Sequence, residues 1–142
     1  MTRYLLDTNV VSETLKPRPA PAITNWLENQ NDDDLFIASY TLAEIWRGVL
    51  TSPEGRRRRA LERWFSSPEG PPALFRGRIL PFDETAAVAW GRVIAEGQAT
   101  GRPRSPLDML IAATAIVNGC VVVTGNERHF QGIVELLNLV NI

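Results

Sequence analysis

The sequence contains little cysteine, histidine or lysine, with one residue of each at Cys120, His129 and Lys16. A single cysteine excludes an intramolecular disulfide, which fits a reducing compartment such as the cytoplasm. No cluster of cysteine and histidine is present to suggest zinc. No apolar run approaches the roughly 18 residues of a membrane span, and the N-terminus lacks the basic and apolar segments of a signal peptide. We therefore expect a cytoplasmic protein without a membrane segment.

The length and composition are those of a globular domain. The 142 residues suit one core, so we expect a single domain over residues 1–142. The net charge is −1, which gives no overall field to attract a polyanion. The 15 basic residues comprise one lysine and fourteen arginines. Arginine binds phosphate better than lysine does, but genome composition explains this bias at least as well.

Apolar runs predict strands that alternate with helices. The predicted strands cover residues 3–6, 35–39, 78–82, 120–124 and 136–142. The predicted helices cover residues 9–16, 21–29, a segment from 41, and residues 54–66, 84–97 and 105–118. Pro81 cannot donate a ladder hydrogen bond, so residues 78–82 should form an edge strand. This alternation is typical of a mostly parallel α/β sheet with helices on both faces.

Two of the predicted helices carry recognisable start signals. The sequence TLAE places Glu44 three residues after Thr41, as in a capping box. The sequence SPLD places Ser105 at the N-cap and Pro106 at the first helical position, with Asp108 two residues later. Gly119 should end this second helix, which is apolar on nearly all sides and is therefore buried. The segment 66–77 is rich in proline and glycine and should be a loop.

Polar side chains recur where the predicted strands end and the following helices begin. Asp7 ends the first strand, Glu44 lies at the start of the helix after the second, and Asn126 follows the strand at 120–124. Asp108 starts the helix that leads into that strand. Sites in parallel α/β sheets form beyond the carboxyl ends of the strands. We therefore expect these four side chains to converge there.

Carboxylates held a few ångströms apart repel one another unless a cation compensates their charge. Ligands that are all oxygen suit Mg²⁺ or Mn²⁺. A hard cation with several waters suits phosphoryl chemistry, because it lowers the pKa of a water and neutralises charge at phosphate. An alternative stays open for Glu44 and Asp108, since acids are common in first helical turns for reasons of capping and helix dipole alone.

Five segments in this order and at these spacings resemble the PIN domain, and more closely the VapC/FitB-type toxins of bacterial toxin–antitoxin pairs. The segments are LLDTNVVSE, TLAEI, RILPFDE, PLDMLIAATA and VVVTGNERHF, and the resemblance covers residues 4 to about 130. It implies a three-layer α/β/α fold with a five-stranded parallel sheet in the order 3-2-1-4-5.

The same resemblance implies a metal-dependent ribonuclease that hydrolyses RNA phosphodiester bonds. Asp7 and Asp108 would be the likelier direct ligands of Mg²⁺ or Mn²⁺, and Glu44 would orient a water or hold a second ion. Asn126 occupies the place of a fourth residue that is often acidic. Thr124 and Asn9 would support the site, as a hydroxyl beside it and a brace for the first loop.

Two positions depart from the family pattern. Asn126 is neutral, although its amide oxygen can still bind a metal or accept a hydrogen bond. His129 stands where relatives often carry a further acid. These departures imply that a second metal binds weakly, or only when substrate phosphate is present. They also keep open a non-catalytic PIN module that binds RNA or a protein without cutting.

The family implies several partners. A small antitoxin would bind DNA through one end and cover the toxin with the other, often placing an arginine in the acid pocket. Homodimers and larger toxin–antitoxin assemblies are usual. Candidates for RNA backbone contacts are Arg47, Arg56, Arg57, Arg58 and Arg59. A solvated helix face, with Glu54 and Glu62 nearby, is the alternative for each of these arginines.

A different enzyme class also begins with an apolar strand that ends in aspartate, namely the phosphatases of the haloacid dehalogenase type. These enzymes need a second aspartate two residues later, where this chain has Asn9. They also need a downstream lysine, and the chain has only Lys16. We expect the nuclease instead.

Overall fold

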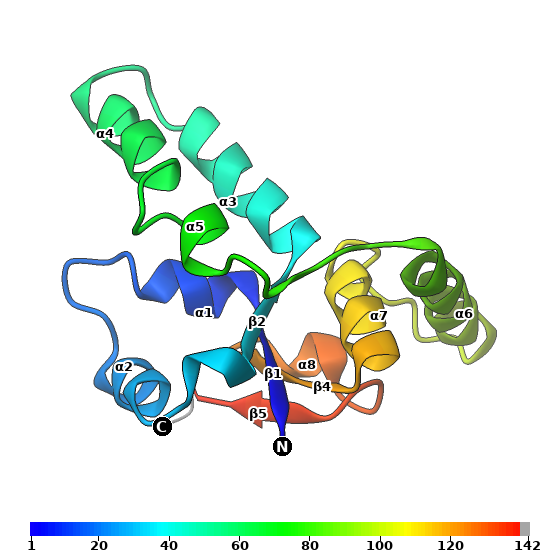
Figure 1. The fold of residues 1–142 in the computed structure, drawn as a ribbon. Helices are drawn as coiled ribbons and strands as arrows, with labels where there is room; N and C mark the ends of the chain where they lie inside the picture. The colour runs from blue at the N-terminus through cyan, green and yellow to red at the C-terminus, as the bar shows by residue number, and fades with distance from the viewer. Residues whose placement is uncertain (140–142) are drawn as a thin grey trace.

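The computed structural model describes residues 1–139. At its centre is a five-stranded sheet in the order β3-β2-β1-β4-β5, in which all neighbours are parallel (Figure 1). The strands are β1 (Arg3–Leu6), β2 (Leu35–Ala38), β3 (Ile79–Leu80), β4 (Cys120–Thr124) and β5 (Leu136–Asn138). The predicted order is confirmed, and β3 lies at an edge, with Pro81 directly after it.

Helices cover both faces of the sheet. They are α1 (Thr8–Glu13), α2 (Pro21–Glu28), the 3₁₀ turn η1 (Asp32–Asp34), α3 (Ser39–Leu50), α4 (Arg56–Phe65), α5 (Pro71–Leu74), α6 (Glu84–Ala99), α7 (Asp108–Asn118) and α8 (Glu127–Phe130). Figure 1 shows α6 and α7 on one side of the strands, with α1 and α2 on the other. Within residues 1–139, no helix is long and apolar enough to cross a membrane.

Side chains that alternate along the central strands build a separate core on each face. Leu5 and Val122 belong to the cluster formed with α6, α7 and α8, whereas Leu6 and Val123 belong to the cluster formed with α1, α2 and α3. These four side chains are at most 3% exposed. Successive residues of a strand point to opposite faces, so near-continuous apolar strands are expected in a sheet covered on both sides.

The helices α3 and α4 form a hairpin that extends away from the sheet (Figure 1). The rings of Trp46 on α3 and Phe65 on α4 pack with their centroids 4.7 Å apart. The predicted arginine run lies at the start of α4.

The predicted capping box is wrong. The helix α3 begins at Ser39, directly after β2, so Thr41 lies inside the helix and is fully buried. The N-cap residue is Ala38, which has no side chain to cap with. The pattern misled because a threonine three residues before a glutamate is also compatible with a helix that starts earlier.

Other predicted boundaries differ by small amounts. The helix α7 begins at Asp108 rather than Pro106, although the Ser105 hydroxyl accepts a hydrogen bond from the Asp108 N–H at 3.4 Å. Gly119 ends α7 with φ +64°, as predicted. The segment 66–77 contains the single-turn helix α5. The part of the last predicted strand at residues 140–142 lies outside the described residues.

Candidate active site

Asp7 follows β1 directly and is 4% exposed. It caps α1, because its Oδ1 accepts a hydrogen bond from the Thr8 N–H at 2.8 Å. Its Oδ2 accepts a hydrogen bond from the Thr124 hydroxyl at 2.7 Å. Both carboxylate oxygens are therefore held in place by neighbours from two strand ends.

This arrangement follows from the sheet. The strands β1 and β4 are parallel neighbours, with Leu6 in register with Val123. The Asp7 N–H continues the ladder by donating to the Val123 carbonyl at 2.9 Å. One residue later on β4 comes Thr124, so its hydroxyl lies beside the Asp7 carboxylate. The carboxyl ends of two parallel strands thus place a buried acid next to a buried hydroxyl.

Glu44 reaches the same place from α3. Its Oε1 accepts a hydrogen bond from the Thr8 hydroxyl at 2.5 Å. The hydroxyl oxygen of the buried Thr41, one turn earlier, lies 3.2 Å from that of Thr8. Thr8 therefore joins the two acids, since its N–H holds Asp7 and its hydroxyl holds Glu44.

Asp108 reaches the site from the first turn of α7. Its Oδ2 lies 2.5 Å from Nδ1 of His129 on α8. The Asp108 side chain is 26% exposed, so this contact lies at the rim rather than in the core.

Glu44 and Asp108 act electrostatically on Asp7. The pKa of the Asp7 carboxyl is raised above its ordinary value of 3.8, and burial is the main cause. The hydrogen bonds from Thr124 and Thr8 oppose this shift, whereas the negative charges of Asp108 and Glu44 add to it. Glu44 and Asp108 therefore lie close enough to Asp7 for their charges to act on it, and the role of the three acids as metal ligands stays a prediction.

The donor set fits a hard divalent ion held by few protein ligands. In the described part of the chain, no three His, Cys, Asp or Glu side chains form a group that could hold a metal. Mg²⁺ usually binds through one or two carboxylates, with waters and substrate phosphate as the other ligands. A cation would favour the ionised form of a carboxylate that is buried and lies beside two further acids.

The two asparagines lie beside the acids. The Asn126 N–H donates to the Thr124 hydroxyl oxygen at 2.8 Å, while its exposed side chain makes no hydrogen bond within residues 1–139. Oδ1 of Asn9 accepts a hydrogen bond from the Gly125 N–H at 3.3 Å. Asn9 thus braces the loop after β4 from α1.

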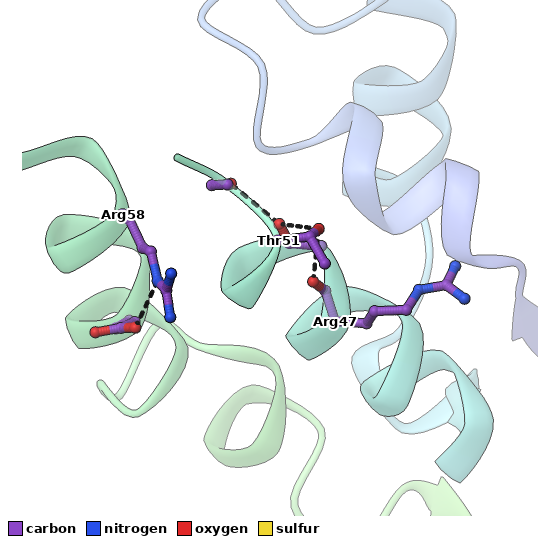
Figure 2. Close-up of polar contacts among 6 residues, drawn as sticks. Arg47, Thr51 and Arg58 are labelled. Carbon is purple, nitrogen blue, oxygen red and sulfur yellow. Dashed lines mark hydrogen bonds and ion pairs between the residues drawn. The ribbon is translucent and has the colours of Figure 1, made fainter. Parts of the chain in front are cut away.

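The predicted RNA-binding arginines lie on the α3–α4 hairpin. Arg47 is exposed, and its side chain extends away from α4 (Figure 2). Nε of Arg58 pairs with Glu62 one turn later at 3.1 Å, as Figure 2 also shows. Arg56, Arg57 and Arg59 are exposed. Arg47 lies near the acids, since its charge acts on the Tyr40 hydroxyl, and Arg57 lines a hollow together with Glu44.

The sequence did not reveal two contributors to the site, Thr8 and Tyr40, or the contact that His129 makes. Thr8 is the first residue of α1, and its role depends on the directions of both its N–H and its hydroxyl. Those directions are known only from the structure. Burial raises the pKa of the Tyr40 hydroxyl, and the charge of Glu44 contributes. That hydroxyl is buried and makes no hydrogen bond within residues 1–139. His129 is exposed, and its Nδ1 contacts Asp108.

Comparison with known proteins defines the class. The PIN domain model matches residues 4–135. The chain therefore belongs to the PIN domain family, and the phosphatase alternative is set aside.

Within this family the chain groups with the VapC/FitB-type toxins. It is 35% identical to the VapC ribonuclease Y4jK of Sinorhizobium fredii, over 89% of each chain. It is 34% identical to the tRNA(fMet)-specific endonuclease VapC of Shigella flexneri, over 92% of each chain.

Two solved structures resemble this chain in both fold and sequence. The crystal structure of FitAcB from Neisseria gonorrhoeae matches with a TM-score of 0.90 and 31% identity, over 98% of this chain and 99% of that one. The DNA-bound VapBC from Salmonella typhimurium matches with a TM-score of 0.78 and 32% identity, over 98% and 99%.

Proposed function

We propose that this protein hydrolyses RNA phosphodiester bonds with Mg²⁺ or Mn²⁺ held by Asp7 and Asp108. The observation that supports this proposal is that Glu44 and Asp108 lie around the buried strand-end carboxylate of Asp7, whose pKa is raised mainly by burial and further by their charges. When bound, the divalent ion would activate a water and neutralise charge at the phosphate.

The chain's own residues prepare that chemistry. Asp7 presents a fixed carboxylate, because hydrogen bonds from Thr8 and Thr124 hold its two oxygens. Hydrogen-bonded partners behind a metal ligand fix its orientation. Glu44, held through Oε1 by Thr8, would orient a water for attack. Asn126 supplies a neutral side chain at the rim of the site.

Family membership gives the biological setting. The protein is the toxin component of a type II toxin–antitoxin module and a divalent-metal-dependent endoribonuclease. Its partners are a cognate antitoxin and RNA. We further propose a cytoplasmic location, a homodimer, and one PIN domain over residues 1–142. Because one relative is named a tRNA(fMet)-specific endonuclease, initiator tRNA is the first substrate to test.

RNA backbone contacts by Arg47 and by Arg56 to Arg59 stay a prediction. The pairing of Arg58 with Glu62 supports a solvated helix face for that residue. The exposure of Arg47 near the acids supports a contact with RNA. Charge reversal of Arg47 should weaken RNA binding and flatten its dependence on salt.

The experiment is an RNA cleavage assay with purified protein in EDTA, Mg²⁺ or Mn²⁺. We expect cleavage only with a divalent ion, and loss of at least about 100-fold in rate for Asp7→Asn and Asp108→Asn, since the metal contributes several kcal/mol. Asp33→Asn, at an exposed position in η1, is the matched control. Wild-type rates in either site variant would overturn the assignment.

A non-catalytic module is the second candidate, because Asn126 is neutral and His129 occupies one oxygen of Asp108. This candidate predicts that RNA binds without cleavage at any concentration of Mn²⁺. Cleavage that depends on Mn²⁺ and on Asp7 would exclude it.

A further inference from the structure

A hollow of about 820 Å³ lies beside the acid cluster, and the proposed function does not use it. Two segments line it, residues 100–105 after α6 and residues 128–133 around the end of α8. Its charged lining residues are all basic, namely Arg102, Arg104, Arg128 and, when protonated, His129. No aspartate or glutamate is among the residues that line it.

Two of these arginines are available to a ligand. Arg104 is occupied, because its Nη1 donates to the Val93 carbonyl at 2.7 Å and lies 3.6 Å from Glu96. Arg102 and Arg128 are exposed, and neither side chain forms an ion pair or hydrogen bond within residues 1–139. The acid next to Arg128, Glu127, accepts a hydrogen bond from Asn138 at 3.1 Å. Arg102 and Arg128 thus line a hollow that has no acidic residue in its wall.

The hollow adjoins the Asp108 end of the acid cluster. Two residues that line it also touch Asp108. The Ser105 hydroxyl accepts from the Asp108 N–H at 3.4 Å, and Nδ1 of His129 lies 2.5 Å from Asp108 Oδ2. A chain of phosphates that enters the acid cluster from this side therefore passes directly into the basic hollow.

We propose that Arg102 and Arg128 bind backbone phosphates of the RNA next to the bond that is cut. The proposal rests on the proposed function, since it extends the same substrate from the acids into the hollow. An acid cluster repels a polyanion, so cations must hold the flanking phosphates. Arginine suits this task because its planar fork donates two hydrogen bonds to one phosphate. RNA is favoured over an acidic protein segment because the hollow shares His129 and Ser105 with the proposed catalytic site.

The arginine run at the start of α4 carries more charge than the pair Arg102 and Arg128, but it lies in a different part of the fold. It starts a helix of the projecting hairpin, and Arg58 is already paired with Glu62 (Figure 2). The proposal therefore assigns phosphate binding to two separate arginines rather than to the longest basic run in the sequence.

The test measures binding of a short fluorescein-labelled oligouridylate to full-length protein in EDTA, by anisotropy at several salt concentrations. The variant is Arg102→Gln with Arg128→Gln. The control is Arg63→Gln with Arg76→Gln, which removes the same charge from exposed positions outside the hollow. We expect the hollow variant to bind at least about tenfold more weakly, with the slope of log K against log salt reduced by about 1.4. The control should change binding by less than about threefold.

Equal binding by the two double variants, with unchanged melting temperatures, would overturn the proposal. A second arm replaces RNA with labelled poly-glutamate. If only poly-glutamate binding depended on Arg102 and Arg128, the hollow would serve an acidic protein segment and the proposal would be wrong. The outcome is separable from the proposed function, because binding is measured without metal and cleavage by wild-type protein is measured with Mn²⁺.

Discussion

The acid cluster has a buried half and an open half, and they are built differently. Asp7 and Thr124 lie at adjacent strand ends and are at most 4% exposed, with both Asp7 oxygens held by hydrogen bonds. Glu44 comes from the second turn of α3 and Asp108 from the first turn of α7. Both are partly exposed, with contacts from Thr8 and His129 respectively. The sheet fixes one acid rigidly, and the helices bring the other two to it.

This difference in burial suits the buried and the exposed carboxylates to different tasks. A buried carboxylate with restricted oxygens provides a constant reference point for an ion. Partly exposed carboxylates keep lone pairs for waters and substrate. Thr8 connects the halves, because one residue donates to Asp7 through its N–H and to Glu44 through its hydroxyl.

The largest loss of activity is expected when the buried acid, Asp7, is replaced. Asp7→Asn should lower the rate of RNA cleavage by at least about 100-fold, whereas Glu44→Gln should lower it by about tenfold, because an orienting group contributes less than a direct ligand. Single-turnover cleavage with saturating Mn²⁺ measures both. A larger loss for Glu44→Gln would reverse the assignment of the two halves.

Removal of the Thr124 hydroxyl, which donates to Asp7, should have the next largest effect. Thr124→Val keeps the shape of the side chain but deletes the donor to a buried carboxylate, which should destabilise the metal-free protein by about 2 kcal/mol. Thr124→Ser retains the hydroxyl and serves as the control. Urea unfolding in EDTA measures the difference, and equal stability of the valine and serine variants would contradict the account.

Thr8 links Asp7 to Glu44 through hydrogen bonds, and a substitution at Thr8 can remove one of them. Thr8→Val retains the N–H that holds Asp7 and deletes the hydroxyl that holds Glu44. We expect cleavage to fall about tenfold, as for other partners behind a metal site, with Thr8→Ser near wild type. If valine and serine cleave RNA at the same rate, the hydroxyl does not couple the two acids.

A smaller effect is expected on the pH dependence of stability, to which the buried Asp7 should contribute. Because the pKa of Asp7 is raised in the folded protein, the folded state holds its proton more tightly than the unfolded state does. Stability of the metal-free protein is therefore lost as pH rises from the ordinary value of 3.8 through the raised pKa, and it stays lost above that pKa.

Asp7→Asn cannot ionise, so it should melt at a higher temperature than wild type at neutral pH in EDTA. Its amide can accept from the Thr8 N–H and donate to the Thr124 oxygen, which keeps both contacts. The gap should close as pH falls toward 3.8. A gap that is absent at neutral pH, or that widens in acid, would show that ionised Asp7 does not destabilise the fold.

The sequence predicted the parts of the site that follow from backbone geometry. Asp7 ends an apolar strand, and a parallel sheet places strand ends together, so a neighbour from the end of the strand at 120–124 could be expected. That Thr124 lies beside the site was implied by the family resemblance. Gly119 was identified because a helix ending in the left-handed region favours glycine. The side-chain contacts could not be derived in the same way. His129 meets Asp108 only because α8 folds back beside α7, and Arg102 shares a hollow with Arg128 for the same tertiary reason.

The most direct test of the central claim is calorimetric titration of Mn²⁺ into wild-type protein, Asp7→Asn and Asp108→Asn. The account predicts a binding site in wild type that is lost or weakened by at least about 100-fold in both variants, because the buried and open acids share one ion. Binding of Mn²⁺ to either variant with wild-type affinity would contradict it.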